Sequence, residues 1–321
     1  MFRFVFESIK NDKLLLNSKA DHELILANDQ KIEVSSISYE GFMILSDLTS
    51  LALGDKNIKF LTENIFLRDI SVLELLEQII GSQGSLFKEY PEFTYLLRMR
   101  IIPALLRILN EKSKPYGSVV RVLRIVQVIL LNQIENAEVE SEVILSYFIH
   151  SLNEKTAEFT NHPEGSTDGG SIPSEIETVE WEQILLLEVL KSVFYDFNVV
   201  RTIFKKYDQQ LDNGNILQSL LFTLNQYYQK FLPPLSEYLE LENNSNPLQI
   251  SKSKSSVKIA FIDHLDKQDP TVPPRTYSSY LILNIILAFL EGVSKFVANL
   301  SSNSSSKTLE SNVHFVSVSL N

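Results

Sequence analysis

The stretch that decides the fold is 91–131, which reads PEFTYLLRMRIIPALLRIL, then the polar break NEKSKPYGS, then VVRVLRIVQVILL. In both apolar parts the hydrophobic residues recur every three to four positions and cover most of the helix circumference, which indicates helices buried on more than one side. Pro91 suits a first helical turn, and Pro103 removes one backbone hydrogen bond and should bend its helix. Two such helices packed back to back are typical of the middle of a helical-repeat stack.

The rest of the chain repeats this helical pattern on both sides of that stretch. Ser71 and Glu74 match the S-x-x-E capping box, and Gly54 and Gly81 are expected to end helices. Helices are predicted at 38–53, 71–81, 91–109, 117–131, 139–152, 179–195, 197–206, 215–231 and 276–300. No convincing set of strands accompanies them, so the fold class is all-α, an armadillo/HEAT-like helical-repeat solenoid, with a compact irregular bundle as the competing fold.

Three kinds of segment interrupt the pattern. Residues 1–37 are interpreted as the end of a preceding helical segment plus a connector, and 38–300 as the helical-repeat domain. Because Gly, Pro, Ser, Asn and charged residues dominate them, 153–178 and 242–257 are predicted to be mobile loops. The Ser/Asn-rich residues 301–321 are predicted to be a disordered tail.

Composition excludes several classes of protein. The chain has 321 residues, no cysteine and a net charge of −11, which argues against wholesale binding to nucleic acid or anionic lipid. The N-terminus does not resemble a signal peptide. Residues 281–300 are apolar and long enough to cross a bilayer, but they include Glu291 and Lys295, so they are predicted to form a buried helix of the core.

A search for catalytic chemistry finds none. The sequence has neither a phosphate-binding loop nor a G-x-S-x-G elbow, and its five histidines are scattered. The glutamates between 135 and 142 surround a helix start and are interpreted as a solvated face that complements the helix dipole. No catalytic residue, metal site or cofactor is therefore predicted, and the chain is interpreted as non-enzymatic.

One charge pattern suggests a binding surface. The residues between 96 and 124 include several basic side chains and a single acid, Glu111. The candidates for partner binding are Arg98, Arg100, Arg107, Arg121 and Arg124, beside Lys112 and Lys114. Helical spacing puts Arg100 with Arg107, and Arg121 with Arg124, on shared faces. Two interpretations stay open: the arginines pair with acidic residues of adjacent helices, or they dock an acidic partner or a lipid phosphate.

Several stretches, in the same order, resemble one family. They are SYEGFMILSDLTSL (38–51), SVLELLEQIIG (71–81), the two apolar parts of 91–131, SEVILSYFIHSL (141–152), WEQILLLEVLKSVFYDFNVVRTIFKKYD (181–208) and IDHLDKQDPTVPPRTYSSYLILNIILAFLEGV (262–293). Together they are similar to the Mon-two family, in the region called "homology upstream of the Sec-seven domain" (HUS). FRFVFESIKND (2–12) resembles the last helix of the preceding dimerisation and cyclophilin-binding segment.

The Mon-two family is related to the large Arf guanine-nucleotide exchange factors. The HUS region of these exchange factors contains a short sequence motif, the box Asn-Tyr-Asp-Cys. At the corresponding positions this chain has Lys206, Tyr207, Asp208 and Gln209. Tyr207 and Asp208 match the box, whereas the first and last residues differ from it. The departure fits the branch without exchange activity. The candidate partner-binding residues therefore also include Lys206, Tyr207 and Asp208. The favoured interpretation of Tyr207 and Asp208 is nevertheless structural: they tie one helical hairpin to the next.

The resemblance implies a function. It implies a non-enzymatic scaffold in vesicle-mediated protein transport between Golgi, endosome and vacuole, cytoplasmic and peripheral at trans-Golgi and endosome membranes. The implied partners are a Dopey-family protein, an Arf-like GTPase and an aminophospholipid flippase; contact with an anionic membrane and homo-oligomerisation stay open. The alternatives are the regulatory region of an Arf guanine-nucleotide exchange factor and, weakly, a nuclear-transport-type adaptor, because the chain has only one tryptophan.

Overall fold

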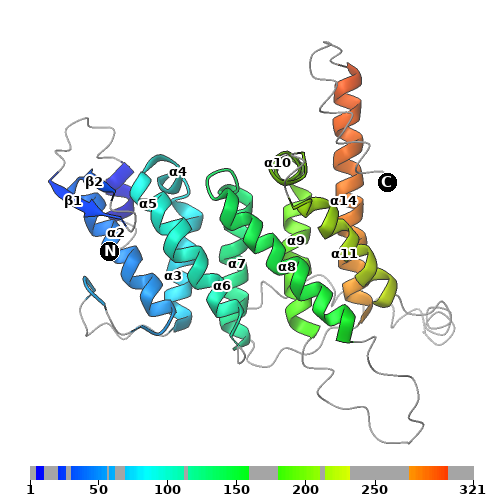
Figure 1. Ribbon diagram of the computed structural model, residues 1–321, viewed down its shortest axis with the longest axis horizontal. Coiled ribbons are helices and arrows are strands. Elements are labelled where there is room, and N and C mark those ends of the chain that lie inside the picture. Colours follow the sequence, from blue (N-terminus) through cyan, green and yellow to red (C-terminus); the bar gives the residue numbers. More distant parts are fainter. Residues whose placement is uncertain are drawn as a thin grey trace, which may run out of the picture. The chain divides into compact units, whose positions relative to one another are not determined.

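The structure is a computed structural model that describes most of the chain. The described residues are 5–10, 21–26, 30–55, 58–61, 69–111, 115–158, 180–209, 214–231 and 275–302. They fall into two compact units, Met1–Ser141 and Glu142–Asn321. Helices dominate both units (Figure 1), so the predicted all-α helical-repeat fold class is confirmed.

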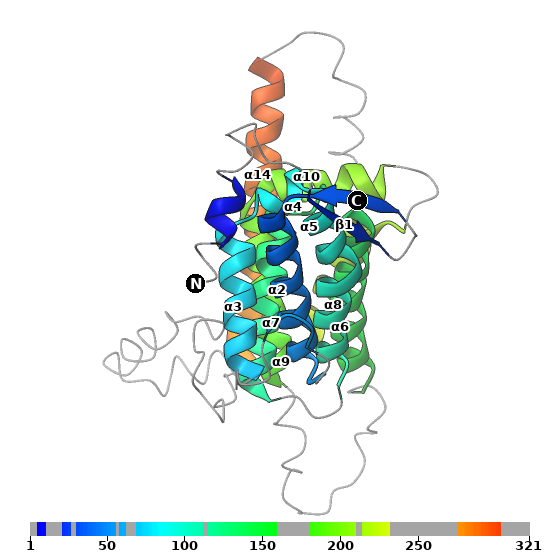
Figure 2. The same ribbon diagram turned by 90° about the vertical axis from the view of Figure 1, so that its left-hand side faces the viewer.

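The first unit is a stack of near-parallel and antiparallel helices. α3 (Asp69–Ser82) contacts α2 (Ser36–Ala52) on one side and α7 (Tyr116–Asn132) on the other. Figure 2 shows these helices side by side with their axes running in nearly one direction. The side chains that fill the space between them are fully buried, among them Leu45, Leu48, Val72, Leu76, Ile80, Val119, Leu123 and Val126. Each such side chain contributes about 1.5–3 kcal/mol when it leaves water, so the stack is held mainly by apolar packing.

The deciding stretch forms a helix with a local change of winding. α4 (Leu86–Glu89) and α5 (Pro91–Leu96) lead into a π-helical turn, η1 (Leu97–Ile101), and then α6 (Ile102–Leu109). The Ile102 amide donates to the carbonyl of Leu97, five residues earlier. A wider turn relieves the clash that Pro103 would otherwise make with the preceding turn. The winding of the helix thus changes directly before Pro103, while the bend predicted there stays a prediction. Pro91 starts α5 as predicted.

A small β-hairpin lies in the segment that the sequence assigned to a connector. β1 (His22–Ile25) pairs antiparallel with β2 (Lys31–Val34), with His22 opposite Val34. The His22 ring stacks on the Tyr39 ring of α2, with 4.7 Å between centroids. Leu24 and Val34 are buried, so the hairpin packs one face against the helices. Strands of four residues carry too little alternation to be recognised in a sequence.

The predicted capping box is wrong. α3 already begins at Asp69, so Ser71 lies inside the helix, and Glu74 contacts α7 instead of its own N-terminus. The predicted stop at Gly54 is confirmed: its φ of 71° is left-handed, a conformation that glycine adopts without steric cost.

The second unit is built around one long helix. α14 (Arg275–Ser302) packs against α9 (Glu180–Tyr195) and α11 (Ile216–Phe231). α10 (Phe197–Ile203) continues into a second π-helical turn, η3 (Phe204–Asp208). Where α10 approaches α14, a Cβ on Gly292 would lie only 2.2 Å from the Phe197 ring. A residue without a side chain therefore allows the two helices to come this close.

The sequence predicted that the helix at 281–300 is buried in the core. This prediction is wrong for about half of the circumference of α14. One face of α14 is buried, and Leu283, Leu287, Leu290 and Val297 on the other face are 40–57% exposed. Its Ser278–Asn299 portion is long and apolar enough to cross a membrane by length and composition. The same holds for core helices of soluble proteins, and here this portion packs its buried face on α9 and α11.

The predicted loops fall mostly outside the described residues. α8 (Glu138–Glu158) extends to Glu158, so the first residues of the predicted 153–178 loop are helical. The segments 159–179, 232–274 and 303–321 lie outside the described residues, and with them the predicted loop at 242–257 and most of the predicted tail.

Candidate partner-binding surfaces

Two of the candidate arginines join α7 to α3. Arg121 Nη2 lies 2.5 Å from Glu74 Oε1, and its Nη1 donates to the Gly117 carbonyl at 3.0 Å. One turn further on, Arg124 Nη2 lies 2.7 Å from Glu77 Oε1. The Arg121 side chain is only 4% exposed. Because the pair on each helix is three residues apart, the two ion pairs form a ladder that fixes the rotation of α7 against α3.

Arg98 is also engaged with a glutamate. It lies in η1, and its Nε is 3.0 Å from both carboxylate oxygens of Glu140, in the first turn of α8. Three of the five candidate arginines thus have the geometry of the first interpretation, pairing with acidic residues of adjacent helices.

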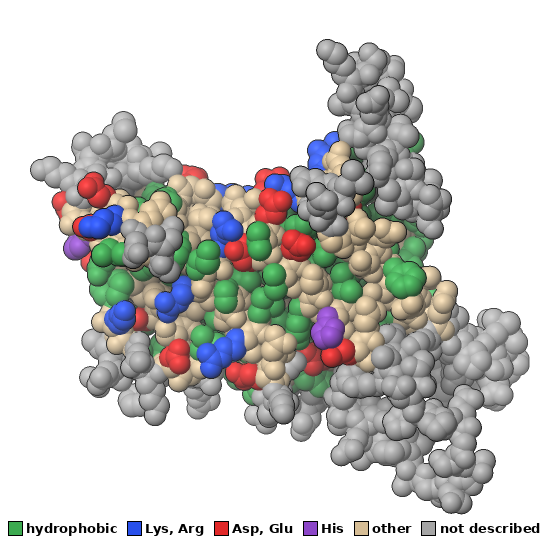
Figure 3. All heavy atoms as spheres, viewed as in Figure 1, with side chains coloured by type: hydrophobic (Ala, Val, Ile, Leu, Met, Phe, Trp, Pro, Cys, Tyr) green, Lys and Arg blue, Asp and Glu red, His purple; other side chains and the backbone are tan. Residues whose placement is uncertain are grey.

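Arg100 and Arg107 differ from the other three. Both are exposed, and neither forms a salt bridge with a described residue. Lys112 and Lys114 lie outside the described residues. The face in Figure 3 carries acidic and basic side chains side by side, without a wide area of one sign over the described part. The structure does not bring all five arginines into one open surface, and partner binding by any of them stays a prediction.

The box residues support the start of the next helix. Tyr207 is 1% exposed and sits in η3. The Asp208 carboxylate accepts hydrogen bonds from the amides of Leu217 at 3.0 Å and Gln218 at 2.9 Å, in the first turn of α11. Such a carboxylate satisfies free amides at a helix N-terminus and complements the helix dipole. This is the geometry expected of the structural interpretation, in which Asp208 ties one hairpin to the next.

Burial and hydrogen bonding act in opposite directions on this carboxyl group. Burial raises the pKa of Asp208, and the backbone amides of Leu217, Gln218 and Ile216 lower it in part. The pKa of Asp208 in the folded chain is therefore above its value in the unfolded chain. The free energy of unfolding therefore falls as the pH rises from the unfolded-state pKa of Asp208 through its folded-state pKa, because the buried carboxyl group ionises less readily. The hydrogen bonds to the ionised carboxylate offset part of the free-energy cost of burying it.

Removing this cap should destabilise the second unit. We expect Asp208→Ala to lower the free energy of unfolding by about 1–2 kcal/mol, since two amides of α11 lose their acceptor. Urea denaturation followed by circular dichroism measures the change. Asp208→Asn keeps one acceptor oxygen at the same reach and should lose less than half as much. Equal losses in both variants would contradict the capping role.

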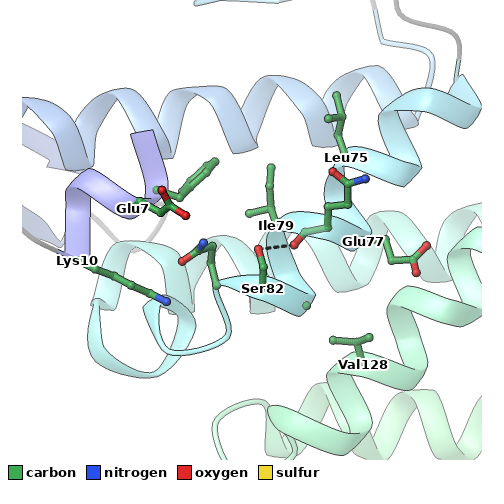
Figure 4. Close-up of a pocket in the computed structure, with 11 residues that line it drawn as sticks. Glu7, Lys10, Leu75, Glu77, Ile79, Ser82 and Val128 are labelled. Carbon is green, nitrogen blue, oxygen red and sulfur yellow. Dashed lines mark hydrogen bonds between the residues drawn. The ribbon is translucent and has the colours of Figure 1, made fainter. Parts of the chain in front are cut away.

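A depression on the first unit offers no catalytic arrangement. It encloses about 870 Å³ between residues 5–10, α3 and α7. Figure 4 shows Glu7 and Glu77 on opposite sides of it, with Ile79 and Ser82 between them. Glu77 already pairs with Arg124, so the two carboxylates do not converge on a shared point. Across the described residues no group of three or more His, Cys, Asp or Glu side chains could hold a metal ion.

The fold and these contacts define a class: a helical-repeat protein in which Arg98, Arg121 and Arg124 join neighbouring helices through ion pairs and Asp208 supports the start of α11. A family model described as "Mon2/Sec7/BIG1-like, HUS domain" matches residues 37–216. The chain belongs to this family, in its HUS domain, and the resemblance noted from the sequence is confirmed.

Named relatives agree with the family model. The chain is 28% identical over 304 residues to Protein MON2 of Saccharomyces cerevisiae, covering 91% of this chain and 17% of the relative. It is 22% identical to the MON2 homolog of Schizosaccharomyces pombe, covering 70% of this chain and 14% of that protein. The human MON2 homolog is 18% identical, with 85% of this chain and 18% of the homolog covered. The chain thus spans less than a fifth of the length of these relatives, and no solved structure matches it significantly.

Proposed function

We propose that this chain is part of a non-enzymatic scaffold that docks partner proteins in vesicle-mediated transport between Golgi, endosome and vacuole. The scaffold is related to the large Arf exchange factors and acts in the cytoplasm, peripheral at trans-Golgi and endosome membranes. Its partners are a Dopey-family protein, an Arf-like GTPase and an aminophospholipid flippase. The observation that carries the proposal is membership of the Mon2/Sec7/BIG1-like family, with alignment to MON2 proteins over 70–91% of this chain in the two fungal relatives.

The structure supports docking more than chemistry. Four of the ionisable candidates, Arg98, Arg121, Arg124 and Asp208, hold helices together, as in the Arg121–Glu74 and Asp208–α11 contacts. Stacked helices leave long faces open to solvent, and such faces bind partners in other helical-repeat proteins. Arg100 and Arg107 are the candidate residues left exposed on such a face.

A second candidate function follows from the same family model, which includes exchange factors of the Sec7 and BIG1 kind. In that case the chain would regulate an Arf exchange domain elsewhere in its protein. Lys206 and Gln209, which depart from the box of the exchange factors, favour the scaffold. The reading frame downstream of this chain discriminates the two: a catalytic exchange domain with its glutamate finger would support the second candidate.

Charge reversal at the two exposed arginines tests the docking surface. We expect Arg100→Glu combined with Arg107→Glu to weaken binding to the Dopey-family protein about tenfold or more, because an attractive charge becomes a repulsive one. Binding is measured by titration calorimetry with purified proteins, and binding to anionic liposomes by co-sedimentation. Circular dichroism should be unchanged, because both side chains are exposed.

The matched control is Lys88→Glu combined with Lys205→Glu, which changes the net charge equally at two other exposed positions. If both double variants lose binding alike, the effect is one of net charge and not of a site. If neither loses binding, Arg100 and Arg107 do not contact the partner, and docking through these two arginines is contradicted.

A further inference from the structure

The depression between residues 5–10, α3 and α7 is lined by a buried polar group that has no partner. Gln83, directly after α3, lines it and is only 6% exposed. Its Oε1 accepts no hydrogen bond from any described residue. A half-turn of the planar amide about its last side-chain bond exchanges Oε1 with Nε2 in almost the same space, so the oxygen can face a ligand in the depression. Because an unsatisfied buried acceptor costs free energy, the partner that is missing at Gln83 is a hydrogen-bond donor.

The end of α3 favours a cation at the same place. Gly81 and Ser82, the last two residues of α3, also line the depression. The C-terminus of a helix carries a partial negative charge that a nearby cation stabilises, and α3 has no basic residue in its last turn. Ser82 Oγ donates its proton to the Gln78 carbonyl at 2.6 Å, so its lone pairs stay available as acceptors. The polar groups at this end of the depression therefore suit a donor with a positive charge.

The charged side chains around the depression agree with this preference. Figure 4 shows Glu7 and Lys10 on one side of it, from residues 5–10, and Glu77 on the other side. Glu77 keeps its ion pair with Arg124, whose side chain does not line the depression. The lining thus has two carboxylates and one ammonium group, in a chain with a net charge of −11. The electrostatic potential of such a chain attracts cationic ligands.

The rest of the lining is mainly apolar and selects the kind of cation. Its side chains are Phe6, Leu75, Ile79 and Val128, and the depression encloses about 870 Å³, enough for a side chain and its neighbours in a peptide. A matching ligand combines an apolar stem with a cationic head that donates in several directions. Arginine has both, because its methylene groups pack on apolar surface and its guanidinium is a planar fork of donors. The ammonium of lysine is more compact and more strongly hydrated.

From this arrangement we propose that the depression is a pocket for an arginine side chain that a partner protein presents. The guanidinium donates to the amide oxygen of Gln83 and lies near the Glu7 carboxylate, and the stem packs on Ile79. The inference rests on the docking function proposed above, because that function supplies the partner. It adds that this face of the first unit selects a basic segment, whereas Arg100 and Arg107 suit an acidic one.

NMR titration of the isotope-labelled full chain tests the pocket. The probes are four capped tetrapeptides, Ala-Leu-X-Ala, in which X is arginine, citrulline, lysine or glutamate; citrulline has the shape of arginine without its charge. The arginine peptide should shift the amide resonances of Gly81, Ser82 and Gln83 and saturate with a dissociation constant of about 0.1–1 mM. The citrulline and lysine peptides should bind at least about fivefold more weakly. The glutamate peptide should cause no saturable shift, because carboxylates repel it.

A substitution at Gln83 separates binding from structure. Gln83→Met keeps the length of the side chain and removes its amide, so binding of the arginine peptide should weaken about tenfold. The urea midpoint should stay the same or rise, since the variant no longer buries an unsatisfied acceptor. The matched control is Gln218→Met, at an exposed position of α11 in the second unit, which should change neither result.

Two charge changes outside the core locate the guanidinium. Glu7 is exposed and Lys10 is half-buried, so neither change should affect folding. Glu7→Gln should weaken binding of the arginine peptide and Lys10→Gln should strengthen it, each about two- to fivefold. Effects of opposite sign from two residues of one short helix are expected only if the positive charge binds beside them.

Three outcomes would overturn the proposal. The first is the absence of saturable shifts at residues 81–83 with the arginine peptide at up to about 10 mM. The second is equal binding of the citrulline or lysine peptide, which would show that shape or net charge alone is recognised. The third is a lower urea midpoint with unchanged binding in Gln83→Met, which would make the amide structural. None of these results bears on the transport function, because no trafficking partner is present, and the Arg100 and Arg107 variants leave this pocket intact.

Discussion

Arg121→Glu should destabilise the first unit by about 3–5 kcal/mol, the cost of an uncompensated charge at a buried position. The substitution places a second carboxylate against Glu74 and removes the hydrogen bond to the Gly117 carbonyl. Domains of this size are stable by about 5–15 kcal/mol, so the variant should lose a substantial part of its free energy of unfolding. Urea denaturation, monitored by circular dichroism at 222 nm, measures the shift of the midpoint.

Matched variants separate the ion pair between buried Arg121 and half-exposed Glu74 from the effect of charge alone. Arg100→Glu has the same chemistry at an exposed position and should cost less than about 0.5 kcal/mol. Arg121→Met keeps the length of the side chain without the charge and should cost far less than Arg121→Glu, because an apolar isostere can replace a buried ion pair. The ladder between α3 and α7 would not be structural if Arg121→Glu and Arg100→Glu cost the same.

The helices could be predicted because their signal is local. In 117–131 the apolar residues recur at helical spacing, and α7 spans Tyr116–Asn132. Pro91 and Gly54 act through their own backbone conformations, so their roles as helix start and helix stop could also be predicted. The structure differs from the sequence prediction where two helices offer different partners to the same side chain. Glu74 satisfies a capping pattern within its own segment, but Arg121 of α7 lies close enough to bind it.

The candidate site was harder to predict because charge in a sequence does not tell which way it faces. Arg121 and Arg100 are both arginines in apolar helices, yet Arg121 is buried and Arg100 is exposed. The difference depends on the position of α3, which comes from tertiary packing. For the same reason the sequence placed all of 281–300 in the core, including the exposed face of α14 with Leu283, Leu287 and Leu290. Helical spacing shows that a row of leucines shares a face, and not that this face has a neighbour.

Asp47 shows a polar contact that the sequence did not reveal. It lies on α2 and is 2% exposed, and its carboxylate accepts three backbone hydrogen bonds from the segment that follows the helix. The donors are the amides of Lys59 at 3.1 Å, Phe60 at 2.7 Å and Leu61 at 2.7 Å. An aspartate in a helix is normally interpreted as a solvated residue. Here the chain after Gly54 returns to the helix and brings these three amides to Asp47, and this course could not be predicted from the sequence.

Asp47→Ala is therefore the second change with a large expected effect, a loss of about 3 kcal/mol in the free energy of unfolding. Hydrogen bonds to a charged acceptor contribute about 1.5–3 kcal/mol each, and water reaching the partly buried amides recovers some of that. Asp47→Asn keeps one acceptor oxygen and should lose about half as much. Hydrogen exchange should show lost protection at Lys59, Phe60 and Leu61, while the exposed Asp55→Ala serves as the control. Retained protection of these amides in Asp47→Ala would mean that the segment is held by apolar packing and that the carboxylate only follows it.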